Sequence, residues 1–283
     1  MKLCRYGKPG YEKPGVIDGE GRLRDLSKVI QNIGPNELSP RQLKTLSRLK
    51  PETMPLVNSS PRLGVPYVGI GKFVAIGLNY SDHAKEAGLP IPSEPIVFMK
   101  ATTCINGPND DIVQPKNSIK LDWEIELGVV IGSPARYVSE ADALTCVAGY
   151  CIVHDVSERA FQMATTQWDK GKGFDTAGPI GPWLVTTDEI RDPQSLDMAL
   201  ELNGKRMQSG NTRTMIFGVA KIVSHVSQYM TLLPGDIIAT GTPPGVGLGV
   251  KPQPVFLKPG DVLTLSIQGL GEQKQKIVPF PGE

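Results

Sequence analysis

One eleven-residue stretch, residues 121–131, constrains the fold more than any other part of the sequence. Apolar and other residues alternate along it, which predicts a β-strand with one buried face. The apolar face carries Leu121, Trp123, Ile125, Leu127, Val129 and Ile131. The opposite face carries Asp122, Glu124 and Glu126. Acidic residues are depleted in strands, and three neighbouring carboxylates repel each other. We therefore expect positive charge beside them.

The strand alone leaves two interpretations of this acidic face open. Carboxylate oxygens suit Mg²⁺, Mn²⁺ or Ca²⁺, and next neighbours on one strand face lie about 6.5–7 Å apart. Alternatively, the face is solvated and its acids are paired with Lys or Arg side chains. Other segments of the chain must decide between a metal site and a solvated surface.

The composition is that of an ordinary globular enzyme and argues against several other classes. The 283 residues are 40% hydrophobic and 21% charged, enough for one large domain and a small one. A net charge of +1 without a basic stripe argues against nucleic acid binding. No apolar run is long enough for a membrane span, and the N-terminal segment lacks a signal-peptide core. The four cysteines form no C-x-x-C pair, so we expect reduced thiols in a cytoplasmic protein.

The chain is predicted to divide into a small N-terminal α/β domain, residues 1–65, and a larger domain, residues 66–283. The 31 glycines and 25 prolines indicate many turns and therefore a β-rich fold. In the first domain we expect two short strands joined by a Gly/Pro-rich loop, and a helix that begins after Ser39. In the second, hairpins dominate the C-terminal half, as in an α+β or mostly-β fold with a rolled sheet.

The elements expected in the N-terminal domain are strands at 2–6 and 22–26 and a helix at 40–49. The strands expected in the larger domain are 73–76, 96–99, 150–154, 183–186, 196–202, 205–208, one ending at 239, 262–267 and 275–278. The expected helices are 82–87, 139–147, one starting at 157, and 214–230. Asn203-Gly204 predicts a type I′ turn between two of the strands.

A short polar helix at 82–87, with Ser81 as its predicted cap, follows a buried strand. His83 and Glu86 lie three residues apart and so share one face of this helix. A helix that buries so little is expected to be mobile, as a lid would be. The alternative, which this pair alone favours, is a surface helix with a neutral histidine and a solvated glutamate.

Asp155 lies where the strand at 150–154 ends and the next helix approaches. Functional side chains often project from such positions, and Arg159 and Gln162 share a face of that helix. The alternative is that Asp155 caps the helix, because Asp155 and Glu158 resemble a capping box. His154 points to the opposite face of the strand, which predicts a core histidine.

Several catalytic motifs are absent from the sequence. It has no G-x-S-x-G elbow, no P-loop and no G-x-G-x-x-G dinucleotide motif that opens a helix. With three histidines and no H-E-x-x-H pattern, zinc is not expected.

Taken together, five segments resemble the fumarylacetoacetate hydrolase family. In chain order they are GLNYSDHAKE (77–86), DWEIELG (122–128), HDVSER (154–159), KGFD (172–175) and TGTPPGVG (240–247). They span the larger domain, and the N-terminal residues resemble a subgroup with a small extra domain. That subgroup includes 2,4-diketo-3-deoxy-L-rhamnonate and L-fuconate hydrolases and proteins often named ureidoglycolate lyase. The resemblance implies a mixed β-roll fold and a homodimer or higher homo-oligomer.

The resemblance also implies roles for individual residues. Mg²⁺ or Mn²⁺ would be bound by Glu124, Glu126 and Asp155, which leaves about three of six octahedral positions for substrate and water. The implied catalytic residues are His83, Glu86 and Lys172. The implied substrate-binding residues are Arg159, Gln162 and Thr242. Asp122 matches no family ligand and is assigned a structural role.

The implied reaction is hydrolysis of the C3–C4 bond of a 2,4-diketo acid. The subgroup favours 2,4-diketo-3-deoxy-L-rhamnonate, which would give pyruvate and L-lactate. Alternatives on the same site are acylpyruvate or fumarylpyruvate hydrolysis, cleavage of the L-fuconate analogue, oxaloacetate decarboxylation, isomerisation of unsaturated keto acids and ureidoglycolate lysis. A metal-binding sugar-acid sensor without catalysis is the remaining alternative.

Overall fold

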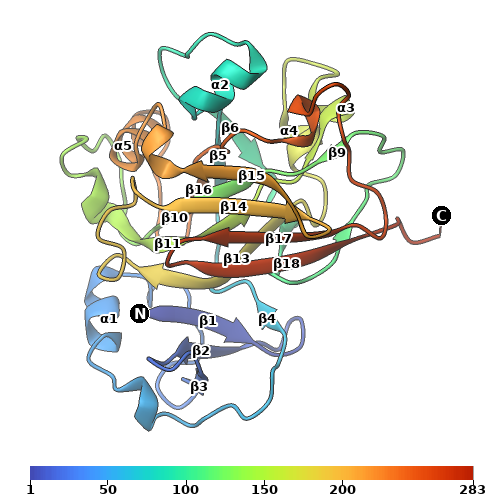
Figure 1. The fold of residues 1–283 in the computed structure, drawn as a ribbon. Helices are drawn as coiled ribbons and strands as arrows, with labels where there is room; N and C mark the ends of the chain where they lie inside the picture. Colours follow the sequence, from blue (N-terminus) through green and yellow to red (C-terminus); the bar gives the residue numbers. More distant parts are fainter. Residues whose placement is uncertain (283) are drawn as a thin grey trace.

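The structure, a computed structural model, describes residues 1–282 and is mostly β (Figure 1). The strands are β1 Lys2–Tyr6, β2 Lys13–Ile17, β3 Leu23–Asp25, β4 Leu63–Gly64, β5 Phe73–Gly77, β6 Ile96–Lys100, β7 Ile105–Asn106, β8 Ile112–Val113, β9 Leu121–Asp122, β10 Ile125–Ile131, β11 Val147–His154, β12 Ser157–Glu158, β13 Gly178–Thr186, β14 Asp197–Leu202, β15 Lys205–Asn211, β16 Ile237–Ala239, β17 Val262–Ile267 and β18 Gly271–Val278. The α-helices are α1 Pro40–Leu46, α2 Ser81–Ala87, α3 Arg159–Gln162, α4 Asp169–Lys172 and α5 Val219–Tyr229. Short 3₁₀ turns cover Pro51–Thr53, Thr102–Cys104, Ala143–Cys146, Thr212–Thr214 and Gly247–Gly249.

Two sheets form the body of the molecule. The larger sheet has the order β3-β2-β1-β13-β11-β10-β16-β5-β6, with β4 and β7 beside β1 and β13. The second sheet has the order β15-β14-β17-β18-β8 and packs across the first (Figure 1). Along β17 every second residue is buried, because one face of the second sheet lies against the core. These mixed sheets confirm the predicted mostly-β class.

The N-terminal residues share the large sheet with the rest of the chain. Strand β1 pairs antiparallel with β13, with Lys2 opposite Val185. Strand β2 was missed, because Pro14 and Gly15 indicated a loop. The proline is tolerated there because β3 pairs only with residues 15–17, so Pro14 lies past the end of that ladder. The predicted cap of α1 is confirmed: Ser39 accepts the N–H of Gln42 at 3.4 Å.

Three helix predictions need correction. Residues 139–147 contain only a 3₁₀ turn, Ala143–Cys146; Ser139 bonds to Asp142 in the bend before it, and β11 begins directly after it at Val147. Helix α5 begins at Val219 and not at Thr214, whose hydroxyl instead contacts the carboxylate of Asp82. The residue before α2 is Tyr80, and Ser81 donates to the carbonyl of Thr214 rather than capping the helix. The predicted end of α2 at Gly88 is confirmed, with φ 66°.

The central predicted strand is present but interrupted between Asp122 and Ile125, giving β9 and β10. Its apolar face is completely buried, as predicted. The acidic face is buried as well: Asp122, Glu124 and Glu126 are 0%, 7% and 2% exposed. The solvation expected in the second interpretation is therefore wrong, whereas the pairing with Arg and Lys side chains that it also expected is present. Within residues 1–282, no helix is both long and apolar enough to cross a membrane.

Candidate active site

Three buried carboxylates from two neighbouring strands converge at one place. Strands β10 and β11 pair antiparallel with Ile125 opposite His154, which places Glu124 beside Asp155. The N–H of Asp155 donates to the carbonyl of Glu124 at 2.9 Å. Carboxylate oxygens of Glu124, Glu126 and Asp155 all lie within 4.8 Å of one another. This is the residue set predicted as metal ligands, and its geometry can hold a cation.

Two buried cations from the segment that follows β11 face these acids. Lys172, at the end of α4, donates to Glu124 Oε2 and Asp155 Oδ2, both at 2.7 Å. Arg159, the first residue of α3, donates to Glu124 Oε1 at 2.7 Å and to Asp122 Oδ2 at 2.8 Å. All of these groups are largely shielded from solvent, so the ion pairs are little weakened by water.

A third cation, Lys100, was not predicted as part of the site. Its ammonium lies 2.5 Å from Asp155 Oδ1 and also donates to the carbonyls of Lys172 and Ala177. The side chains of Lys100 and Asp155 are both 0% exposed. Lys100 therefore holds Asp155 and the end of α4 in place. The only sequence signal was a lysine directly after the apolar residues 96–99, which is also how many surface strands end.

The cations are shared unequally among the acids. Burial raises the pKa of Glu124, but Lys172 and Arg159 outweigh burial and hold that pKa well below its usual range. Burial, together with the charges of Asp155 and Glu124, holds the pKa of Glu126 well above its usual range. The only hydrogen bond to the Glu126 carboxylate, among the residues that the structure describes, is from the N–H of Gly241 at 2.8 Å. Glu126 is therefore the acid that lacks a cation.

The loop 241–248 binds further carboxylates through its main chain. The N–H groups of Gly247 and Leu248 donate to Asp122 at 2.6 and 3.0 Å. These bonds, with that from Arg159, account for Asp122 as a structural residue, as predicted. A Cβ on Gly247 would lie 2.0 Å from the carbonyl oxygen of Val255, so the chain can pass here only as glycine.

The predicted dyad is present on α2. His83 Nδ1 lies 3.0 Å from Glu86 Oε2, and since the carboxylate can only accept, Nδ1 carries the proton. The N–H of Gly245 also donates to Glu86 Oε1 at 3.0 Å, which ties α2 to the loop 241–248. The side chains of His83 and Glu86 are 16% and 26% exposed. Both side chains are thus mostly shielded from solvent, unlike the solvated surface pair that was the alternative for this helix.

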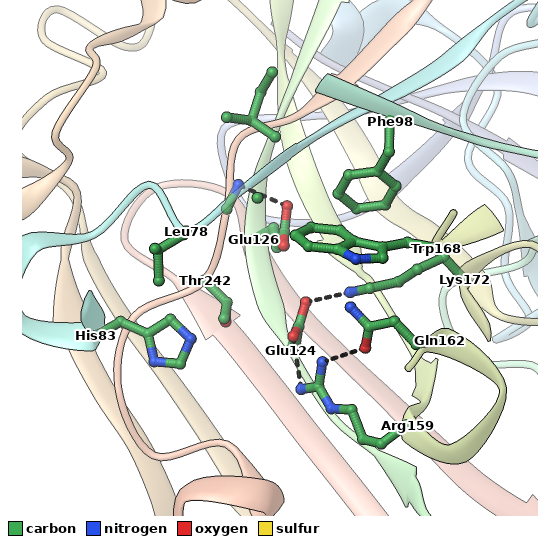
Figure 2. A pocket seen from close by; sticks show the side chains of 13 residues that line it. Leu78, His83, Phe98, Glu124, Glu126, Arg159, Gln162, Trp168, Lys172 and Thr242 are labelled. Atoms are coloured by element: carbon green, nitrogen blue, oxygen red, sulfur yellow. Dashed lines mark hydrogen bonds and ion pairs between the residues drawn. The ribbon is translucent and has the colours of Figure 1, made fainter. Parts of the chain in front are cut away.

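A cavity of about 100 Å³ lies between the acids and α2 (Figure 2). Figure 2 shows His83 on the opposite side of this cavity from Gln162 and Lys172, with Glu124 between them. The cavity is lined by Ile76, Gly77, Leu78, His83, Phe98, Glu124, Glu126, Arg159, Gln162, Trp168, Lys172, Gly241 and Thr242. Seven of the nine predicted site residues therefore line it, while Asp155 lies behind it and Glu86 borders the next cavity.

All three predicted substrate contacts are already engaged within the protein. Arg159 donates to Gln162 Oε1 at 3.0 Å, so the amide N–H₂ of Gln162 remains as a donor. The hydroxyl of Thr242 donates to the carbonyl of Ile125 and accepts from Gln208, both at 2.8 Å. The hydroxyl proton of Thr242 is therefore already used, and is not free for a substrate carboxylate.

Trp168 is a second site residue that the sequence did not indicate. Its indole stacks edge-on against Phe98, with ring centroids 5.3 Å apart, and lies directly over Gly77. A Cβ on Gly77 would lie 2.5 Å from Trp168 Cζ3. The close approach of the indole ring thus depends on glycine at position 77. The ring forms one wall of the cavity.

The helix-cap interpretation of Asp155 is wrong. Helix α3 begins at Arg159, and Glu158 caps it by accepting the N–H of Phe161 at 2.7 Å. His154 is a core residue, as predicted: it is fully buried and its Nδ1 lies 3.1 Å from Gln275 Oε1.

A family model and a curated protein each match most of the chain. The family model described as fumarylacetoacetate (FAA) hydrolase C-terminal matches residues 72–278. A protein of Burkholderia multivorans, provisionally named a hydrolase, is 60% identical over 276 residues, which cover 97% of this chain and 98% of that protein.

Solved structures resemble the whole chain. A fumarylacetoacetate hydrolase from the psychrophile Exiguobacterium antarcticum has a TM-score of 0.86 and 33% identity, covering 99% of this chain and 100% of that one. Maleylpyruvate hydrolase from Sphingobium has a TM-score of 0.82 and 28% identity, with coverage of 99% and 100%. A 2-hydroxyhepta-2,4-diene-1,7-dioate isomerase from Mycobacterium marinum has a TM-score of 0.76 and 34% identity, with full coverage of both chains.

Proposed function

The chain belongs to the fumarylacetoacetate hydrolase family, and on that premise we propose that it is a metal-dependent hydrolase that cleaves the C3–C4 bond of a 2,4-diketo acid. One observation carries the proposal. Three buried carboxylates that can hold a cation lie on one side of a small cavity, and a His–Glu pair lies on the other.

The donor set fits a hard divalent cation. Mg²⁺ and Mn²⁺ prefer oxygen ligands, and the three carboxylate oxygens lie within 4.8 Å of one another. The four buried acids Asp122, Glu124, Glu126 and Asp155 face three buried bases, Lys100, Arg159 and Lys172, which leaves one negative charge in excess. Glu126 has no cationic partner and its pKa is raised by burial and by the neighbouring acids, so it would give up its proton and carry that charge when a cation binds. Glu124, Glu126 and Asp155 would hold the ion, which would supply Lewis-acid stabilisation of negative charge on the substrate oxygens.

The residues around the cavity then have distinct tasks. With its Nδ1 held by Glu86, His83 presents Nε2 as the base that removes a proton from water. The hydroxide adds to C4, the electron pair of the C3–C4 bond passes to C3, and C3 takes up a proton. The products are a carboxylic acid and pyruvate. Lys172, between Glu124 and Asp155, stabilises the charge that develops on the pyruvate half.

A second reaction on the same site is favoured by the named activity of the Mycobacterium marinum neighbour, an isomerase. Isomerisation or decarboxylation also needs stabilised negative charge on a keto acid, but neither adds water to a carbon. These reactions should therefore depend less on His83 than C–C hydrolysis does. The products separate the reactions, because only hydrolysis releases two carbon fragments with uptake of water.

The test is a coupled assay for pyruvate release across a panel of 2,4-diketo acids, with Mg²⁺, with Mn²⁺ and with EDTA. The panel includes 2,4-diketo-3-deoxy-L-rhamnonate, the substrate that the sequence resemblance favours. Release that requires the metal supports the proposal, and no release from any member refutes it. Oxaloacetate and ureidoglycolate, assayed for their own products, test the alternatives.

Two variants assign the residues. Glu126→Gln should weaken Mn²⁺ binding, measured by electron paramagnetic resonance, by more than about 100-fold, because even outer-shell partners of metal ligands contribute 10–100-fold. Its control is Glu201→Gln, on strand β14 of the second sheet. His83→Ala should lower kcat by about 100-fold and leave Mn²⁺ binding unchanged, whereas His225→Ala on α5 should change neither. Full activity of His83→Ala would contradict its role as the base.

We also propose that the protein works as a homodimer or higher homo-oligomer, as the family resemblance implies. Light scattering during size-exclusion chromatography would test this. A mass of one 30.6 kDa chain would contradict it.

A further inference from the structure

A second, larger cavity continues from the first, away from the acids. It measures about 320 Å³, against about 100 Å³ for the cavity beside the acids. The two cavities share Leu78, His83 and Arg159 as lining residues. The two cavities are therefore neighbours, and a molecule bound beside the acids that extends away from them would pass these three side chains into the outer cavity.

The walls of the outer cavity are mainly apolar. They include Ala87 at the end of α2, Leu89 just beyond that helix, and Val246 and Leu248 from the loop that follows β16. Leu89 and Leu248 are 53% and 36% exposed. Covering two partly exposed leucines with an apolar group removes their side chains from water, which favours binding of such a group.

One side chain at this cavity offers a free cation. Lys251 borders the cavity and forms no ion pair with any residue in the range 1–282. Glu86 also borders it, but His83 and the N–H of Gly245 engage the oxygens of Glu86. Arg159 is likewise held by Asp122 and Glu124. Lys251 is thus the group there that is available to an anion.

We propose that this outer cavity binds the acyl part of the substrate, and that it selects an unbranched apolar tail of several carbons ending in a carboxylate. Leu89 and Leu248 contact the methylene groups, and Lys251 pairs with the terminal carboxylate. The inference rests on the proposed function, because it places the diketo acid head beside the three acids. It departs from a short hydroxylated tail such as that of 2,4-diketo-3-deoxy-L-rhamnonate, whose hydroxyl would lose water without gaining a partner among the leucines.

The experiment compares kcat/KM across substrates that share one head. In the series 2,4-dioxopentanoate to 2,4-dioxooctanoate, each added methylene should raise kcat/KM by about threefold to fourfold, as burial of one methylene predicts. 2,4-Dioxohexanoate should be preferred over its 5-hydroxy derivative, which is the diketo-rhamnonate itself. 2,4-Dioxooctanedioate should be preferred over 2,4-dioxooctanoate by up to about fivefold, the upper end of the range for an exposed ion pair.

Two variants with matched controls assign these preferences to residues. Lys251→Gln should abolish the preference for the dicarboxylate, whereas Lys205→Gln, on the exposed β14–β15 hairpin, should keep it. Leu248→Gln should reduce the gain in kcat/KM per methylene. The control Leu144→Gln, at another exposed leucine that does not line either cavity, should leave that gain unchanged.

The outcomes separate this inference from the proposed reaction. Turnover of 2,4-dioxopentanoate without any gain from longer tails, or a dicarboxylate preference that survives Lys251→Gln, overturns the inference and leaves the reaction standing. If no diketo acid is cleaved, the proposed reaction is refuted. Calorimetric affinities for the same acids then decide the inference, since an affinity that does not rise with tail length overturns it.

Discussion

Replacing Lys100 with methionine measures how strongly the buried charge network supports the fold. Its ammonium lies 2.5 Å from Asp155 Oδ1 and donates to the carbonyls of Lys172 and Ala177, with both charged side chains 0% exposed. Removing one member of a buried ion pair costs about 3–5 kcal/mol of unfolding free energy, because the partner charge stays buried. Asp155 keeps its bond to Lys172, so we expect the lower end, about 3 kcal/mol. The corresponding fall in Tm is about 6–12 °C.

The assay is urea unfolding followed by tryptophan fluorescence, in EDTA so that no bound metal contributes. The matched control is Lys72→Met, which also removes a lysine 2.5 Å from a buried aspartate, Asp236. Lys72 is 24% exposed, and Asp236 keeps the N–H groups of Lys72 and Leu233 as donors. That variant should lose only about 1 kcal/mol. Equal losses in the two variants would refute the argument that burial sets the size of the effect.

Three further predictions follow from other parts of the structure. Burial lowers the pKa of His154 to about 4 from 6.5, so between pH 6.5 and pH 4 the unfolded chain binds a proton that the folded chain does not. The unfolding free energy should therefore fall by up to about 1.4 kcal/mol for each pH unit in this range. In urea titrations His154→Gln should flatten this slope, and an unchanged slope would contradict the argument. Gly77→Ala should displace Trp168, shift the tryptophan emission and lower turnover, whereas Gly19→Ala, where a Cβ would meet nothing within 4 Å, should do neither. All four cysteines are buried, and burial raises the pKa of Cys4 to about 12 and of Cys104 to about 11. A thiol reagent at pH 8 should therefore label no cysteine in the folded protein and all four in denaturant. Rapid labelling of the folded protein would contradict this burial.

Sequence alternation located the acids because it is a local property. The period of two in residues 121–131 places Glu124 and Glu126 on one face, and the structure buries that face. Alternation could not reveal the interruption after Asp122, where Trp123 and Glu124 lie between β9 and β10. That interruption lets β9 pair with β12, which carries the chain toward Arg159.

The bases were harder to assign, because their partners are distant in the sequence. Lys100 and Asp155 are 55 residues apart, and Arg159 reaches Asp122 across 37. Nothing in the residues around Lys100 distinguishes a lysine that enters the core from one that ends a strand at the surface. The resemblance to the family did indicate Lys172 and Arg159, since both lie in segments that carry that resemblance. Trp168 lies outside the matched segments and gave no signal.

In the loop 241–248, main chain and side chains contact different parts of the site. Its backbone N–H groups bind Glu126, Glu86 and Asp122, which belong to three different elements. Main-chain donors stay in place when a side chain is exchanged, provided that the glycines are kept. The side chains of Val246 and Leu248 meanwhile face the outer cavity. Substitutions at these two side chains can change which substrate is accepted while the reacting groups keep their positions. New specificities can therefore evolve in this loop without passing through an inactive intermediate.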